Sequence, residues 1–208
     1  MSQALGITTT EFLGRFTDNG GTTLRFEADG RCVFVTASGC QVHPRRPLVC
    51  RLYPLGRMTD DAGEERFAVF PPEPGCGAKT DGPGTVESFL ESQDVGPYCE
   101  WSRRYGQLYQ RMLGLLDRAG VEGKVETPAV EHPEGGPAGP APIDTGPISS
   151  WQDIDASLAE YCAAKGIAAP AGIEGSIDLH LAAMREWLDG LEARIGPAPG
   201  ESKGAGGS

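Results

Sequence analysis

The chain has 208 residues, a formal net charge of −11, 30 glycines and 17 prolines. This length allows one large domain or one domain with appendages, and the glycine and proline content predicts a large share of loop. The acidic balance excludes a broad electrostatic surface for nucleic acid or for an anionic membrane. Because no apolar run reaches about 18 residues, no membrane-spanning helix is expected either.

The first residues lack the basic start and apolar stretch of a secretory signal. A cytoplasmic location is therefore expected, and thiols are kept reduced there. In that compartment a set of spaced cysteines favours a metal site over a framework of disulfides.

The first predicted helix begins after Thr8, which can act as its N-cap with Glu11 three residues later. Phe12, Leu13 and Phe16 fall on one face of this helix. The sequence thus predicts a short amphipathic helix near the N-terminus.

Short strands are expected over residues 22–26 and 31–36, joined by a turn at Asp29-Gly30. Residues 38–57 should be irregular because three prolines forbid a long helix or a central strand. A third strand is expected over residues 66–70.

The second half of the chain is predicted to be helical. Helices are expected over residues 85–91 and 98–119, the second with a buried stripe at three- and four-residue spacing. Two further amphipathic helices, over 150–165 and 177–195, predict a C-terminal helical hairpin. The expected fold class is α+β: a small irregular antiparallel sheet with metal-binding loops, surrounded by helices.

These elements divide the chain into four predicted parts. Residues 1–122 would form a cysteine-cluster metal-binding domain, and residues 123–148 a Gly/Pro-rich linker. Residues 149–196 would form the helical hairpin, and residues 197–208 a disordered tail.

Four of the six cysteines fall within 45 residues: Cys32, Cys40, Cys50 and Cys76. None forms a Cys-x-x-Cys pair, so their spacing alone is a weak zinc signal. Each lies near glycine or proline, where a loop can direct a sulfur inward. Residues 31–57 also contain five arginines and no acid, and guanidinium groups stabilise thiolates. A metal site is favoured over buried or free thiols.

The segment Arg46-Pro47-Leu48-Val49-Cys50-Arg51-Leu52-Tyr53-Pro54, preceded by Cys32, Phe34 and Cys40, resembles the YkgJ-type cysteine-cluster family. That family is catalogued as zinc- or iron-chelating, and the resemblance covers roughly residues 5–115. It implies Cys32, Cys40, Cys50 and Cys76 as metal ligands. It also implies a supporting role around them for Arg46, Arg51 and Tyr53, with Tyr53 expected in the core.

The family pattern usually opens with a compact CxxCxxCC group, whereas the first cysteine here is Cys32. Either that group has been removed from this chain, or this member works with four cysteines. His43 has a Cys-x-x-His spacing from Cys40, yet the family often has an aromatic residue there, so no ligand role is predicted. Cys99 and Cys162 are expected to be incidental thiols.

Three functions are compatible with these residues. The first is a zinc- or iron-binding protein with a structural ion and no turnover. The second is an iron–sulfur redox or sensing protein, because four cysteines also suit a cluster. The third is a methyltransferase-related enzyme, by analogy with flagellin lysine methylases that have a related cysteine cluster. The chain has no recognisable adenosylmethionine loop, so a non-enzymatic role is favoured and the metal ion is the expected partner.

Overall fold

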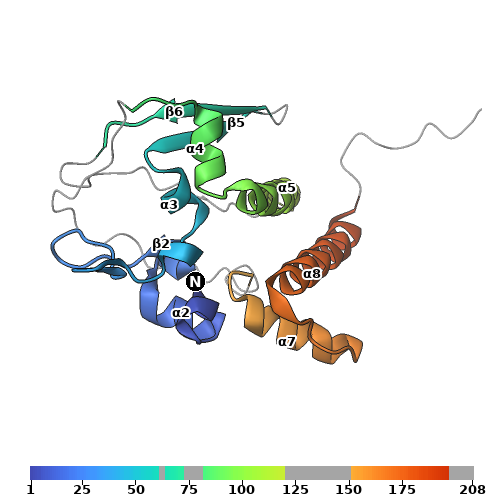
Figure 1. Ribbon diagram of the computed structural model, residues 1–208. Helices are drawn as coiled ribbons and strands as arrows, with labels where there is room; N and C mark the ends of the chain where they lie inside the picture. Colours follow the sequence, from blue (N-terminus) through green and yellow to red (C-terminus); the bar gives the residue numbers. More distant parts are fainter. Residues whose placement is uncertain (61–63, 73–81, 120–150, 197–208) are drawn as a thin grey trace, which may run out of the picture. The chain divides into compact units, whose positions relative to one another are not determined.

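The structure is a computed structural model that describes residues 1–60, 64–72, 82–119 and 151–196. The α+β class is confirmed: the chain combines helices with small antiparallel sheets (Figure 1). In these described ranges the strands pair in three separate two-stranded sheets. None of the helices described is both long and apolar enough to cross a membrane.

The chain divides into two compact units. The first, called here the cysteine unit, comprises Met1–Ile7 and Phe26–Arg103. The second, called the helical unit, comprises Thr8–Arg25 and the chain from Arg104 onward. Contacts therefore group residues 8–25 with the C-terminal helices, a partition that the linear order of elements does not indicate. The predicted linker at 123–148 and the tail at 197–208 lie outside the described residues.

The cysteine unit combines short helices with two hairpins. Its elements are α1 (Ser2–Leu5), β3 (Val35–Thr36), β4 (Gly39–Cys40), η2 (His43–Arg45), α3 (Leu48–Leu52), β5 (Leu55–Thr59), β6 (Glu65–Val69), α4 (Val86–Ser92) and the first part of α5 (Gly96–Arg118).

The hairpin predicted around Asp29-Gly30 exists only in part. The Gly30 amide donates to the Glu27 carbonyl at 2.9 Å, and Phe26 pairs with Cys32 in a single bridge. The prediction of a continuous strand over 31–36 is wrong, because the chain turns after Cys32 and only Val35–Thr36 extends, pairing with β4.

The predicted third strand forms as β6, and its partner is β5, which the sequence had placed in an irregular stretch. The register pairs Leu55 with Val69. Gly56 has a packing reason to be glycine, since a Cβ there would lie 2.0 Å from the Phe70 ring.

The predicted start of α4 is confirmed. Thr85 accepts a hydrogen bond from the Ser88 amide at 3.1 Å, and the Ser88 hydroxyl oxygen accepts from the Thr85 amide at 3.0 Å. This reciprocal box satisfies two amides that a helix end leaves without partners.

The helical unit contains α2 (Thr9–Phe16), β1 (Thr17–Asp18), η1 (Asn19–Gly21), β2 (Thr23–Leu24), the rest of α5, α7 (Ile154–Lys165) and α8 (Gly172–Ile195). The Thr8 cap is confirmed, because its side chain accepts from the Glu11 amide at 3.1 Å. The helical hairpin is confirmed as α7 packed on α8 (Figure 1).

Polar contacts join two pairs of helices in this unit, α2 with α7 and α5 with α8. The N-terminal helix α2 packs on α7, where the Thr9 amide donates to Asp155 at 2.7 Å and the Thr9 hydroxyl donates to Asp153 at 2.6 Å. On α5 and α8, the Tyr105 hydroxyl lies 2.9 Å from Nδ1 of His180, a side chain that is only 1% exposed. The predicted stripe on α5 is buried at Leu108, Met112 and Leu115.

Candidate metal centre

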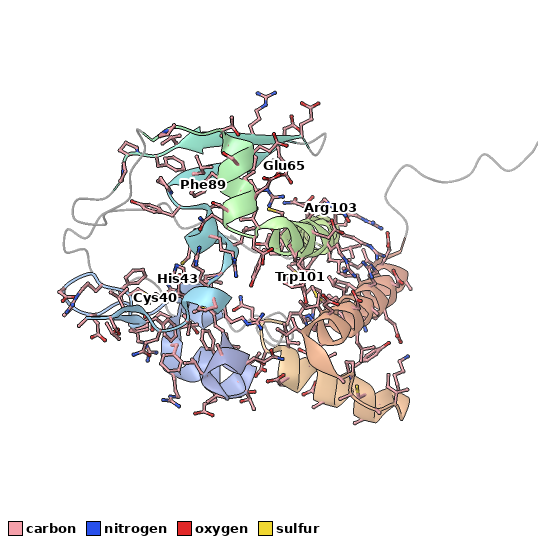
Figure 2. All side chains as sticks on the ribbon, viewed as in Figure 1. Cys40, His43, Glu65, Phe89, Trp101 and Arg103 are labelled. Carbon is pink, nitrogen blue, oxygen red and sulfur yellow. The ribbon has the colours of Figure 1, made fainter. Side chains whose placement is uncertain are left out.

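Cys32 and Cys40 are brought near each other by a chain reversal. The Val35 amide donates to the Cys32 carbonyl at 2.9 Å, which turns the chain just after the cysteine. Strands β3 and β4 then pair Val35 with Cys40. Gly39, the first residue of β4, has φ +102°, a conformation that favours glycine. The second cysteine therefore returns opposite a residue only three positions from the first. Figure 2 labels Cys40 and, three residues later in the same unit, His43.

Cys50 is the central residue of α3, a helix that sequence reasoning missed. Pro47 stands at its N-cap, where a proline costs no helical hydrogen bond. Although the residue as a whole is exposed, desolvation raises the pKa of its thiol. Negative charge on Cys32 and on Cys40 raises this pKa further, and Arg46 lowers it. The negative charges of Cys32 and Cys40 therefore both act on Cys50.

The chemical type of these side chains suits a metal ion, whereas their arrangement, among the residues that the structure describes, does not form a site. Three thiols in one region fit zinc or iron, both of which are bound by cysteine sulfur. However, no three Cys, His, Asp or Glu side chains in the described ranges are arranged closely enough to hold an ion. The predicted fourth ligand, Cys76, lies outside the described residues.

Among the described residues of the cysteine unit, Arg51 is the most buried cation, with 6% of its surface exposed. Its Nη2 donates to the Pro44 carbonyl at 2.8 Å, and its Nε donates to the Arg46 carbonyl at 3.3 Å. The guanidinium carbon also lies 4.0 Å from the centre of the Tyr98 ring, whose hydroxyl accepts a hydrogen bond at 2.8 Å. The buried Arg51 side chain therefore stabilises the loop between Cys40 and Cys50 by hydrogen bonds to its carbonyl groups.

The charge of Arg51 is balanced by neutral oxygens. Among the described residues no carboxylate forms an ion pair with it, and its acceptors are carbonyls and a phenol. Buried charges in proteins are usually paired with an opposite charge. The cysteine unit thus contains a buried positive charge one residue from Cys50.

Arg46 is less buried than Arg51, and its guanidinium group contacts two side chains. Its Nη1 lies 2.7 Å from Nε2 of His43, and its Nη2 donates to the side-chain oxygen of Gln93. His43, for which no ligand role was predicted, is exposed and lies against this guanidinium. The expectation that Tyr53 belongs to the core is wrong, because the residue is 39% exposed at the end of α3.

Sequence reasoning missed two residues of this region, Gln93 and Tyr98. Both contact Arg51, the former through its carbonyl at 2.6 Å and the latter through its hydroxyl. Gln93 is the C-cap of α4 and Tyr98 lies in the first turn of α5. No local pattern marks either residue, since each is more than 40 positions from the arginine that it contacts.

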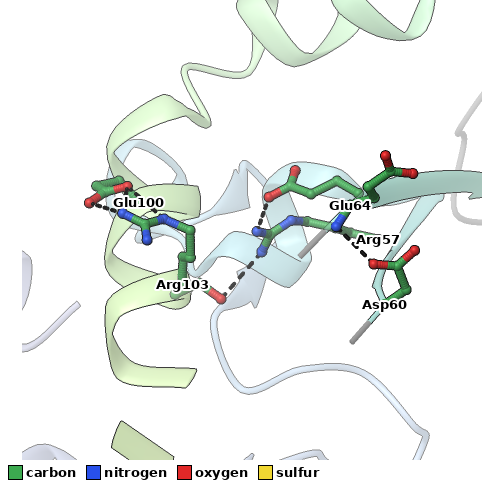
Figure 3. A network of polar contacts seen from close by, with 7 residues as sticks. Arg57, Asp60, Glu64, Glu100 and Arg103 are labelled. Carbon is green, nitrogen blue, oxygen red and sulfur yellow. Dashed lines mark hydrogen bonds and ion pairs between the residues drawn. The ribbon is translucent and has the colours of Figure 1, made fainter. Parts of the chain in front are cut away.

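The remaining described cysteines lie in other environments. Cys162 is buried on α7 in the helical unit. Cys99 is half-buried in the first turn of α5, and desolvation raises its thiol pKa more than the nearby Arg57 lowers it. Figure 3 shows that arginine in a polar network, donating to Glu65 and, at 3.4 Å, to the Ser102 hydroxyl. That both cysteines are incidental thiols stays a prediction.

Comparison with known proteins identifies a family whose pattern part of the chain matches. Residues 3–73 match the family described as "CxxCxxCC: Putative zinc- or iron-chelating domain". The matched segment contains Cys32, Cys40 and Cys50, ends before Cys76, and is shorter than the predicted range of 5–115. No curated protein and no solved structure matches the chain. The resemblance inferred from the cysteine spacing and the Arg46–Pro54 element is therefore confirmed over residues 3–73.

Proposed function

We propose that this chain binds a zinc or iron ion through the thiolates of Cys32, Cys40, Cys50 and Cys76. The observation that carries the proposal is that the first three cysteines belong to one compact unit, with Cys40 on the β3–β4 hairpin and Cys50 on α3. The match of residues 3–73 to a zinc- or iron-chelating domain supports the choice of metal.

Charge supports the same site. Four thiolates around a divalent ion leave about two negative charges. Arg51 supplies a buried cation beside Cys50 that has no carboxylate partner among the described residues, and the charge of Arg46 lowers the pKa of the Cys50 thiol. An anionic metal–thiolate centre would provide the counter-charge that this region lacks.

The ion is proposed to be structural. Few large apolar side chains are buried in the described part of the cysteine unit, namely Phe34, Val42, Leu52 and Val95. An ion that joins the hairpin to α3 would add cross-links where apolar burial is small, since metal binding contributes directly to folding free energy. A cytoplasmic location, where thiols stay reduced, is part of this proposal.

The test is elemental analysis of protein purified without oxygen, together with single Cys→Ser variants. One zinc or iron per chain, reduced by Cys32→Ser, Cys40→Ser, Cys50→Ser or Cys76→Ser, is the expected result. Cys99→Ser and Cys162→Ala are the matched controls and should retain the metal. A brown preparation with acid-labile sulfide would instead identify the iron–sulfur alternative. Absence of metal in the wild-type chain would refute the proposal.

A further inference from the structure

Both arginines of the Arg46–Pro54 element donate hydrogen bonds to the same residue, Gln93. Arg46 donates through Nη2 to the side-chain oxygen of Gln93, and Arg51 donates through Nη1 to the backbone carbonyl of Gln93 at 2.6 Å. Gln93 lies 20 positions beyond the segment that matches the chelating domain. One glutamine thus receives two charge-assisted hydrogen bonds from the segment that carries Cys50.

The amide of Gln93 is itself held in a fixed orientation. Its Nε2 donates to the Ser92 hydroxyl at 3.1 Å, and that hydroxyl donates to the Phe89 carbonyl at 2.7 Å. The backbone amide of Gln93 donates to the Phe89 and Leu90 carbonyls, at 3.1 and 3.2 Å, and closes the last turn of α4. Both the side chain and the backbone of Gln93 are therefore hydrogen-bonded within the end of α4.

The arginines that Gln93 contacts belong to, and hydrogen-bond with, the segment between Cys40 and Leu52 that contains Cys50. Arg51 donates to the Pro44 and Arg46 carbonyls, which lie between Cys40 and Cys50. We infer that Gln93 is a positioning residue of the candidate metal centre: it fixes Arg46 and Arg51, and through them the separation of Cys40 from Cys50. The inference rests on the proposed function, and it extends the centre beyond residues 3–73 to the end of α4.

The test uses the full chain and Co²⁺ as the probe, titrated against a competing chelator and followed by sulfur-to-cobalt charge-transfer absorption. Gln93→Met removes the side-chain acceptor at similar volume and should weaken Co²⁺ binding roughly 10- to 100-fold, the usual effect of losing an outer partner of a ligand. Gln93→Glu retains an acceptor for Arg46 and should restore binding. Gln107→Met, on the exposed side of α5, is the matched control and should have no effect.

Two further measurements separate positioning from general destabilisation. The effect of Gln93→Met should be absent or small in an Arg46→Met background, because the two groups act as a unit. Amide exchange over residues 43–53 of the metal-free chain should also rise in Gln93→Met. Wild-type binding in Gln93→Met, failure of Gln93→Glu to restore it, or additive effects in the double variant would overturn the inference.

Loss of the proposed function gives a different result. If the wild-type chain takes up no Co²⁺, no Zn²⁺ and no iron, the metal proposal fails by itself. Amide exchange of the metal-free variants then still decides whether Gln93 holds the loop, and unchanged exchange over residues 43–53 overturns that contact as well.

Discussion

Each of the two units is stabilised internally by a different kind of interaction. The described part of the helical unit buries nine apolar side chains along its helices: Leu108, Met112, Leu115, Leu158, Cys162, Ile177, Leu181, Met184 and Leu188. The cysteine unit buries fewer, and its best-connected side chain is the cation Arg51. Amphipathic helices can fold by burying a stripe, whereas short loops and hairpins need hydrogen bonds and cross-links. The two units should therefore respond to different perturbations.

Removal of the metal should have the largest effect, and only on the cysteine unit. Loss of a structural ion costs on the order of 10 kcal/mol in small metal-dependent domains, because binding and folding are coupled. Chelation should therefore release amide protection over residues 26–57 while α7 and α8 stay protected. Hydrogen exchange read by mass spectrometry checks this. Equal loss of protection in both units would break the comparison.

A cavity made in the helical unit should destabilise that unit and leave the cysteine unit unaffected. Leu181 is fully buried on α8, so Leu181→Ala should lower the free energy of unfolding of that unit by about 2–5 kcal/mol. Urea denaturation followed by the fluorescence of Trp151 and Trp187, whose ring centres lie 4.8 Å apart, measures this loss. Metal content should be unchanged. A variant that also loses its metal would show that the units are not independent.

Loss of the buried cation should destabilise the cysteine unit by about 2–3 kcal/mol, because hydrogen bonds to charged groups contribute roughly 1.5–3 kcal/mol and their carbonyl partners are left buried. The variant is Arg51→Met, and Arg45→Met, at an exposed neighbouring position, is its control. Trp101 fluorescence in denaturant compares the two. Equal stability of the two variants would contradict the role given to Arg51.

The smallest effect is a pH dependence of the helical unit. Burial lowers the pKa of His180, so the folded state prefers the neutral ring, while the unfolded chain binds a proton near pH 6.5. Stability is therefore complete above that pH and falls as pH drops below it, by at most about 1.4 kcal/mol per pH unit for one proton. Urea denaturation from pH 7.5 to 5 measures the slope.

His180→Gln should flatten this slope, and His43→Gln, at an exposed position in the cysteine unit, should leave it unchanged. The environment of the ring explains the cost of protonation. One nitrogen contacts the Tyr105 hydroxyl, and Nε2 is buried with no partner among the described residues, so an added proton there would go unsatisfied. A slope that survives His180→Gln would assign the pH dependence to another group.

Features that depend on neighbouring residues were predictable from the sequence. Thr8 and Thr85 cap the helices that their local patterns indicate, and the stripe on α5 is buried as its spacing predicts. The short helix α3 was missed because prolines on both sides suggested loop, although Pro47 occupies a position where proline is tolerated. Strand β5 was missed because it directly follows Pro54, which also suggested loop.

The candidate site was predictable only as a set of residue types. The cysteines and the flanking arginines are visible in the sequence, and the match over residues 3–73 agrees with them. The partners of those arginines are not visible, since Gln93 and Tyr98 meet them only after α4 and α5 have folded against the loop. Tyr53 was misplaced because a motif position does not determine how much of a side chain is exposed.

The pairing of α2 with α7 affects the order in which the protein can fold during synthesis. Thr9 finds its partners Asp153 and Asp155 more than 140 positions later, so α2 leaves the ribosome long before α7 exists. Residues 26–103, by contrast, emerge as one stretch. We therefore expect the cysteine unit to be able to bind the proposed ion on the nascent chain. The apolar face of α2 should stay exposed, and accessible to chaperones, until α7 has been synthesised.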